Sequence, residues 1–303
     1  MSPRRRAPEP PLPVRDGLGP VRIRLRESGC VVDELVSRFG SAAAEKVSRG
    51  EVVDAAGVPV TADTHLPARA SVYTYREAAV EIPVPFAIDV LHWDENVLVI
   101  DKPHFLSTMP RGRHVTETAL VRLRKALDLP ELSPAHRLDR LTAGVLLFTV
   151  RREARSAYQS LFAQRQVSKT YEALAPVDPD VTLPVTLRSR IIKRRSILQA
   201  FEEPGPVNAE THIELVERVG AVGRYRLTPI TGQTHQLRLH MSGLGIPIVN
   251  DPLYPTIVDV GEDDFSRPLA LLARSIEFRD PLSGKQIRYQ SGRDLGFESF
   301  VPG

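Results

Sequence analysis

The chain has 303 residues, 42% of them hydrophobic, which is enough for one large domain, or a large and a small one, with a real core. A formal charge of +3 permits nucleic-acid binding without arguing for it. The single cysteine, Cys30, excludes a disulfide framework and a cysteine-based metal site and fits a reducing cytoplasm. No apolar run follows the basic N-terminus or approaches the roughly eighteen residues of a membrane span, so we expect a cytoplasmic protein.

Composition shifts predict three segments. Residues 1–20 contain Arg4-Arg5-Arg6 and five prolines up to Pro13, a composition that predicts a disordered, solvated tail. Two prolines keep the stretch near residue 82 extended, so it connects to the main domain. We therefore expect a small domain over residues 21–81 and a large one over residues 82–303.

The small domain begins with short helical and alternating patterns. We expect helices at 31–39 and 42–48, a hairpin at 51–60 that turns at Ala56-Gly57, and a strand at 71–75. This order of elements is similar to the S4 RNA-binding domain. Only Arg38, Lys46 and Arg49 decorate the two helices, so a degenerate packing domain remains the alternative.

The large domain mixes apolar runs of strand length with helical periods. Asp101-Lys102-Pro103 follows the first run as a polar turn, and Thr231 or Thr234 is positioned to cap a helix that ends near Gly243. We expect strands at 97–100, 145–150, 168–175, 209–219 and 224–230, a hairpin of 276–279 with 286–290, and helices at 116–127 and 151–167.

Residues 133–148 form the chemical centre of the sequence. A charged turn that ends in glycine runs into an apolar, strand-like segment, so Asp139 would sit on a loop held at the end of a buried strand. Arg137 and Arg140 flank it, and a cation within about 4 to 6 Å lowers a carboxylate pKa by roughly 1 to 3 units. Asp139 would then stay ionised as a nucleophile or base. The alternative is an aspartate that only closes a turn between solvated arginines.

Four ordered motifs resemble the RluA family of RNA pseudouridine synthases. The first three stretches are Asp101-Lys102-Pro103, the H-R-L-D-x-x-T-x-G signature at residues 136–144, and the K-x-Y-x-A motif at residues 169–173. The fourth, at residues 231–240, is similar to T-G-R-x-H-Q-I-R-x-H. A kinase H-R-D loop is excluded, because the chain lacks a glycine-rich phosphate loop and its nearest approach to D-F-G is Asp264-Phe265-Ser266.

Three positions depart from the family pattern. Phe105 stands where the first motif commonly has glycine, Gln233 replaces the usual arginine of the last motif, and Leu272 occupies a position where relatives commonly have histidine. All three lie beside the expected catalytic residues. They would change backbone geometry, substrate contacts or packing, and leave the chemistry intact.

The resemblance implies an α+β fold, with a mixed, mostly antiparallel central sheet and flanking helices. It implies isomerisation of uridine to pseudouridine in rRNA or tRNA, without a cofactor, a membrane or an obligate protein partner. Asp139 is the expected catalyst, Tyr171 would stack on the uracil, and Arg238 would be the ion-pair partner of Asp139. The implied RNA-contacting residues are His136, Arg137, Thr142, His235 and Gln236. The composition of the basic run at residues 187–195 adds Arg190, Lys193 and Arg194 as expected RNA contacts.

The target uridine would have to flip out of its helix, and Arg137 could fill the vacated space. The basic run at residues 187–195 would contact phosphates, although such runs are often only solvated surface. His235 and His240 are five residues apart and on different sides of a helix, which argues against a zinc pair. Two rival functions stay open: a catalytically idle RNA-binding protein of the same fold, and a carboxylate glycosidase or nucleosidase, which would need a second acid that no motif supplies.

Overall fold

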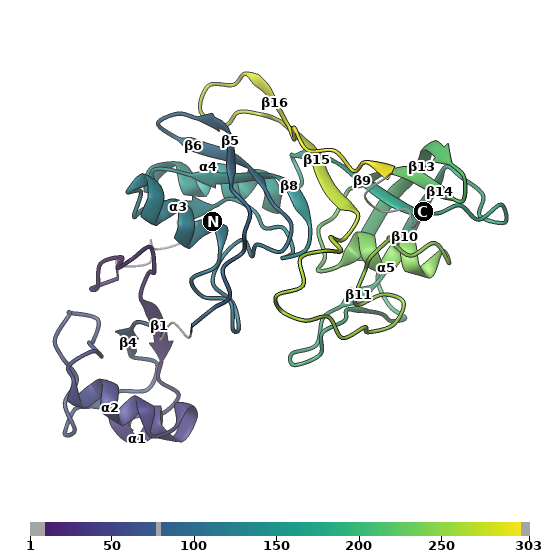
Figure 1. Cartoon of the computed structure of the whole chain (residues 1–303). Coiled ribbons are helices and arrows are strands. Elements are labelled where there is room, and N and C mark those ends of the chain that lie inside the picture. The colour runs from purple at the N-terminus through teal and green to yellow at the C-terminus, as the bar shows by residue number, and fades with distance from the viewer. Residues whose placement is uncertain (1–9, 77–79, 298–303) are drawn as a thin grey trace. The chain divides into compact units, whose positions relative to one another are not determined.

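The structure is a computed structural model that describes residues 10–76 and 80–297 (Figure 1). The chain separates into two compact units, Met1–Val80 with Arg124–Pro130, and Glu81–Leu123 with Glu131–Gly303. The basic triplet Arg4-Arg5-Arg6, expected to lie in a disordered tail, falls outside the described residues.

The first unit contains the two predicted helices, α1 (Val31–Phe39) and α2 (Ala42–Ser48), at the predicted positions. Strand β1 (Val21–Arg24) pairs antiparallel with β4 (Ser71–Thr74), and β2 (Gly29–Cys30) pairs with β3 (His65–Leu66). The helices pack on this small framework because each turns an apolar side inward. The core that results comprises Leu25, Val31, Leu35, Val47, Val52, Val60 and Val72.

The segment predicted as a hairpin at residues 51–60 does fold back on itself around Ala56-Gly57. Val53 and Pro59 form an antiparallel bridge, the Asp54 N–H donates to the Val58 carbonyl at 2.9 Å, and the Val60 N–H donates to the Val52 carbonyl at 2.8 Å. The pairing is short, and the Asp54 carboxylate closes the turn by accepting hydrogen bonds from the backbone N–H groups of Ala56 and Val58, at 2.8 and 2.9 Å. This turn of the Asx kind holds the segment in a tight loop.

The second unit is built on a ten-stranded sheet in the order β10-β13-β14-β9-β15-β8-β6-β5, with β16 beside β15 and β7 beside β8 (Figure 1). Neighbouring strands run antiparallel except β15 and β8, which are parallel. This confirms the predicted α+β fold with a mixed, mostly antiparallel sheet. The strands are β5 (Asp89–Trp93), β6 (Val97–Lys102), β7 (Ser133–Pro134), β8 (Ala143–Thr149), β9 (Ser168–Pro176), β10 (Val185–Ser189), β13 (Ala209–Val219), β14 (Val222–Pro229), β15 (Leu271–Arg279) and β16 (Gln286–Gln290); β11 (Ile191–Ile192) and β12 (Phe201–Glu202) form a separate pair.

Helices α4 (Arg152–Ala163) and α5 (Gln236–Gly243) pack on different parts of this sheet, and α3 (Ala119–Leu127) precedes β7. Ala154, Tyr158 and Leu161 of α4 join a core with β6, β8 and β15. Leu237 and Met241 of α5 join another with β9, β14 and β15. The two cores meet along β8 and β15, where apolar residues of both strands belong to one core at one end and to the other core further along.

Two predicted helices are shorter in the structure. The helix expected at 116–127 begins at Ala119, because the Thr118 hydroxyl accepts the Val121 N–H at 3.2 Å and serves as its cap. The helix expected at 151–167 ends at Ala163, and Arg165 then takes a left-handed φ of 58°. The left-handed residue turns the chain directly into β9.

The polar turn predicted at Asp101-Lys102-Pro103 is wrong. Strand β6 continues through Asp101 and Lys102, and both side chains are buried. Asp101 accepts hydrogen bonds from the Ser291 hydroxyl and from the Gly292 N–H at 2.8 Å, so its charge is satisfied inside the unit. A buried carboxylate with such partners lets the strand extend where composition predicts a turn.

The glycine commonly found at the Phe105 position has a physical reason. Phe105 has a left-handed φ of 66°, a conformation that glycine adopts without steric cost. Its side chain is 5% exposed and lies 6.1 Å from the Phe86 ring and 5.3 Å from the Phe265 ring. Aromatic packing therefore compensates for backbone strain, which confirms that this departure concerns backbone geometry.

We expect Phe105→Gly to be more stable than Phe105→Ala by about 1 kcal/mol, the reverse of the usual order, because only alanine keeps the left-handed strain. Both should be less stable than the native chain, since both lose the buried ring. Chemical denaturation of the three proteins tests this. Equal stability of the two variants would contradict a strained backbone at this position.

Candidate active site

Asp139 lies on a loop that is fixed at both sides. The loop leads into β8, which pairs in parallel with β15 through Ala143 with Leu272 and Gly144 with Ala273. The Asp139 carbonyl accepts the Thr142 N–H at 3.1 Å. On the preceding side, the Thr108 hydroxyl accepts the Leu138 N–H at 3.1 Å and donates to the Leu138 carbonyl at 2.8 Å. These bonds hold the backbone of the Asp139 loop in one place before substrate binds.

A buried lysine supports this loop. The Lys102 side chain has no exposed surface, and its ammonium donates to the carbonyls of Pro103, Leu106 and Arg140 at 3.0, 2.8 and 3.3 Å. Burial lowers the pKa of Lys102 to about 7, although the charge of Asp139 opposes the shift. Lys102 thus ties the residue after Asp139 to the end of β6.

The burial of Lys102 determines whether stability rises or falls with pH. The Lys102 pKa falls from 10.5 to about 7 on folding, so above pH 7 the unfolded chain holds a proton that the folded chain has released. Stability must therefore rise with pH over this range. Between pH 6 and 9 we expect the free energy of unfolding of the native chain to increase by on the order of 2 kcal/mol more than that of Lys102→Met. Urea unfolding of both proteins at the two pH values measures it, and parallel changes would contradict the assignment.

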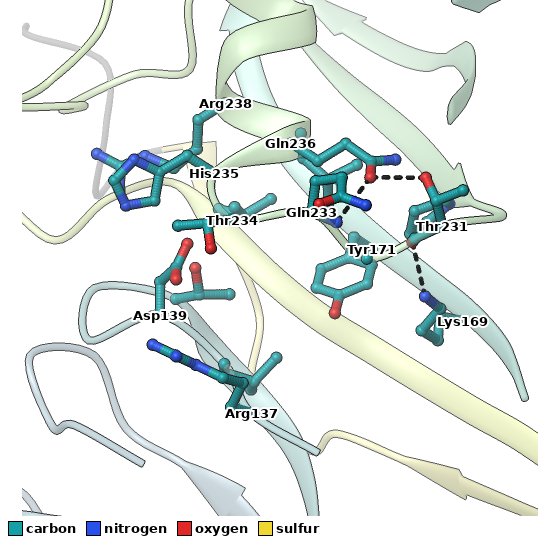
Figure 2. A pocket seen from close by; sticks show the side chains of 16 residues that line it. Arg137, Asp139, Lys169, Tyr171, Thr231, Gln233, Thr234, His235, Gln236 and Arg238 are labelled. Carbon is teal, nitrogen blue, oxygen red and sulfur yellow. Dashed lines mark hydrogen bonds between the residues drawn. The ribbon is translucent and has the colours of Figure 1, made fainter. Parts of the chain in front are cut away.

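The Asp139 loop, strand β9, the segment after β14 and the start of α5 enclose one pocket, lined by 16 residues. Figure 2 shows Asp139 on one side of it, near Thr234, with Tyr171 between Asp139 and Lys169. The pocket brings together most of the site residues predicted from sequence, although they are spread over 102 positions. These lining residues are Asp139, Tyr171, Arg238, Arg137, Thr142, His235 and Gln236.

Tyr171 lies in the wall formed by β9. Burial raises the pKa of its phenol, and the negative charge of Asp139 raises it further. The phenol is therefore neutral at physiological pH, and its ring is available for a planar base to stack on. Since Asp139 influences its ionisation, the two predicted residues share one electrostatic environment.

The predicted ion pair between Arg238 and Asp139 is wrong. Arg238 instead holds Asp251 with two parallel hydrogen bonds, from Nε to Oδ2 at 2.7 Å and from Nη2 to Oδ1. Both side chains are buried, at 2% and 0% exposure. In the part of the chain that the structure describes, no cation lies within ion-pair distance of Asp139. Sequence reasoning missed Asp251, which only a packed structure brings to Arg238.

Arg238 nevertheless acts on the pocket through its charge. Burial lowers its pKa, but the hydrogen bonds and charge of Asp251, with a smaller contribution from Asp139, raise the pKa above its usual value. The guanidinium is thus permanently charged beside Asp139 without binding it. A carboxylate that keeps its lone pairs free in such a field suits attack or proton abstraction.

The family-model comparison matches residues 96–243 to the model described as RNA pseudouridylate synthase. The dual-specificity RNA pseudouridine synthase RluA of Pasteurella multocida is 32% identical over 211 residues, covering 67% of this chain and 92% of the relative. The chain belongs to the RluA family of RNA pseudouridine synthases. Residues from three of the four motifs therefore line the pocket of an RNA isomerase.

Two further comparisons agree with this membership. The ribosomal large subunit pseudouridine synthase D of Pseudomonas aeruginosa is 30% identical over 219 residues, covering 67% of this chain and 68% of the relative. The solved structure of human RNA Pseudouridylate Synthase Domain Containing 4 has a TM-score of 0.55 and 26% identity, and the match covers 70% of this chain and 90% of that one. No helix of the described residues of this pseudouridine synthase has the length and apolarity that a membrane crossing requires.

His235 enters the pocket of this RluA-family enzyme from an unusual backbone position. It is the residue before α5, with a left-handed φ of 58° and no side-chain cap. The prediction that Thr231 or Thr234 caps the helix is wrong, because the Thr231 hydroxyl donates to the Gln236 side chain at 2.7 Å. The His235 Nδ1 lies 3.1 Å from the Tyr254 hydroxyl. Burial lowers the pKa of His235 to about 4 against the opposing charge of Asp139, so the ring is neutral.

Two residues form the opposite wall. The Gln236 side chain uses its oxygen for Thr231 and the Gln233 N–H, and its nitrogen for the Glu210 carbonyl and the Thr211 hydroxyl. It therefore builds the pocket. Lys169 belongs to the K-x-Y-x-A motif but is not one of the predicted site residues. It lines the pocket and donates to the Thr231 carbonyl at 2.9 Å. Its position two residues before Tyr171, on the same side of β9, was the available signal.

His136 is a correction to the predicted set of RNA contacts. Its Nε2 accepts the Leu147 N–H at 3.1 Å, and its ring stacks on Phe162 with centroids 4.3 Å apart. Burial lowers its pKa to about 3, so it is neutral, and it is not among the residues that line the pocket. The imidazole supports β8 from within the fold.

The basic run is also outside the pocket. Arg190, Lys193 and Arg194 do not line it, and each has a local partner: the Pro204 carbonyl, the Ile197 carbonyl and the Glu203 carboxylate, respectively. Because the partners come from the returning half of the same hairpin, the sequence pattern of cations without intervening acids did not reveal them. Lys193 and Arg194 are exposed and Arg190 is partly exposed, so all three can exchange these partners for a phosphate.

The departures from the family pattern also have structural explanations. Gln233 lines the pocket, and its amide donates to the Asn208 carbonyl at 3.2 Å. Leu272 is completely buried and pairs with Ala143 across the parallel contact of β15 and β8. Gln233 thus faces the pocket, and Leu272 belongs to the core.

Proposed function

We propose that this chain isomerises specific uridines of rRNA or tRNA to pseudouridine with Asp139 as its catalyst. The observation that carries the proposal is the convergence of Asp139, Tyr171 and the buried Arg238 charge on one pocket. In the reaction the bond between uracil N1 and ribose C1′ breaks, the base rotates, and C5 bonds to C1′. The C5 proton is lost and N1 gains one, so the product is an isomer and no external group is consumed.

Asp139 supplies the carboxylate for this exchange. It can attack C1′, remove a ribose proton to give a glycal, or add to uracil C6. In each case its rigid loop and uncommitted oxygens favour the reacting geometry. Positive charge that develops at the sugar would be stabilised by the carboxylate, as in glycosidases. Tyr171 stacks on the uracil, and the buried charge of Arg238 keeps the electrostatic field around Asp139 positive.

A uridine in a duplex reaches this pocket only after it flips out, at a cost of a few kcal/mol. Arg137 is exposed and lines the pocket, so it is placed to enter the vacated space in the RNA. Thr142 and His235 contact the flipped nucleotide. Arg190, Lys193 and Arg194 bind phosphates further along the strand, where they add salt-dependent affinity without sequence information.

Tritium release from RNA labelled at uridine C5 tests this function, with rRNA and tRNA transcripts as separate substrates. Release from one class, followed by mapping of pseudouridine in it, identifies the substrate. Binding without release from either class supports the rival, an idle RNA-binding protein of the same fold, and overturns the proposal. Free uracil among the products would instead indicate a glycosidase. The proposed location is the cytoplasm, without an obligate protein partner.

A further inference from the structure

Asp251 occupies a position that the proposed chemistry does not yet use. Its carboxylate is fully buried, and besides both bonds from Arg238 it accepts the N–H groups of Leu253 and Tyr254 at 2.8 and 3.2 Å. Four donors therefore fix its two oxygens. A carboxylate held this firmly sets the orientation of whatever it binds.

The segment around Asp251 is anchored to the sheet. The Val249 N–H donates to the Leu174 carbonyl of β9 at 2.9 Å, and its carbonyl accepts the Ala270 N–H at 3.0 Å. Asn250 has a left-handed φ of 59°, which directs the chain toward Arg238. The backbone next to Asp251 is thus fixed to β9, the same strand that carries Tyr171.

The same segment also reaches His235. Tyr254 is buried, its hydroxyl bonds both the N–H and the carbonyl of Ala200, and its ring lies 5.4 Å from the Arg238 guanidinium carbon. The hydroxyl is also the partner of the His235 Nδ1. Asp251 binds the Tyr254 N–H, and Tyr254 contacts His235. The positions of both Arg238 and His235 in the pocket therefore depend on the turn at residues 251–254.

We propose that Asp251 is a positioning residue for pseudouridine formation, acting through Arg238. By binding Nε and Nη2 it keeps the guanidinium from closing onto Asp139, so the catalytic carboxylate feels the positive charge while its oxygens stay free for the nucleotide. The Nη1 edge of Arg238 has no hydrogen bond among the described residues and remains for substrate in the reacting complex. This role rests on the proposed catalytic function of Asp139.

A double-mutant cycle tests the role, with Asp251→Asn, Arg238→Gln and the double variant. We expect Asp251→Asn to lower kcat about 100-fold, with KM within about threefold, because the guanidinium loses its orientation while substrate binding is kept. We expect the double variant to match Arg238→Gln within about twofold. The amide oxygen that Asp251→Asn introduces still accepts the N–H groups of Leu253 and Tyr254, so the substitution removes only the charge and the bonds to the guanidinium. The double variant contains no unpaired buried charge, and in Arg238→Gln the Asp251 carboxylate keeps the N–H groups of Leu253 and Tyr254. This comparison therefore requires only these two variants to fold, and it does not depend on Asp251→Asn.

Glu172→Gln is the matched control. Glu172 holds Arg274 with two bonds, at 2.8 and 2.6 Å, on β9 and β15, but neither residue lines the pocket. The control should lose stability and keep kcat. A kcat of Asp251→Asn within threefold of the native value, or a double variant tenfold slower than Arg238→Gln, would overturn the positioning role. The proposed function is judged separately by Asp139→Asn, which retains its fall in activity whichever result Asp251 gives.

Discussion

Asp139→Asn should abolish tritium release from uridine-labelled RNA, lowering the rate by on the order of 10⁴-fold or more, as removal of a reacting group does in other enzymes. The amide fills the same space in the loop between Leu138 and Thr142, but it is a poor nucleophile and a poor base. Because the loop is held by backbone bonds and by Lys102, the variant should fold and bind RNA with affinity close to native. The loss should therefore appear in kcat.

Asp180→Asn is a suitable control, since Asp180 is exposed and does not line the pocket. Both variants should be compared with the native chain at matched folding, shown by thermal unfolding and circular dichroism. Turnover by Asp139→Asn within tenfold of the control would show that another group performs the chemistry. This result would contradict the proposed role of Asp139 but would not affect the family membership.

Gly144→Ala should be the most destabilising single methyl addition in the large unit. Gly144 has a φ of 111°, and a Cβ there would lie 2.2 Å from the Ala273 carbonyl oxygen and 2.7 Å from the Ala273 nitrogen. Both clashes are with backbone of β15, which is held on its other side by β9, so neither strand can move away. We expect a loss of about 4 kcal/mol or more, and loss of activity because the Asp139 loop ends at this contact.

Gly220→Ala measures the cost of a left-handed backbone conformation without a steric clash, and so separates the two effects expected at Gly144. Gly220 also has a left-handed φ, of 60°, but a Cβ added there would meet no atom within 4 Å. It should lose only about 1 kcal/mol, the conformational cost that glycine avoids. Denaturant unfolding of both variants gives the comparison. Equal losses would mean that the β8–β15 contact is looser than the structure shows, and that the motif glycine serves the loop's conformation alone.

Local sequence pattern was sufficient to predict many of the helices and strands of this protein. Periodicity located α1, α2, β8, β9, β13 and β14 because helices and strands bury a face at a fixed spacing along the chain. It failed where a distant partner changes the outcome. Asp101 and Lys102 continue β6 because Ser291 and the Asp139 loop satisfy their charges, and nothing next to them in sequence indicates either partner.

The sequence by itself predicted Asp139 as the catalytic carboxylate, because this residue lies in a contiguous signature. It also brought Tyr171 and Arg238 to the site through motifs of their own. Only the tertiary structure decided how charges pair there. Arg238 binds Asp251 and leaves Asp139 free, and His136 turns into the core, because long-range strand pairing sets the distances at which a guanidinium or an imidazole meets its partners.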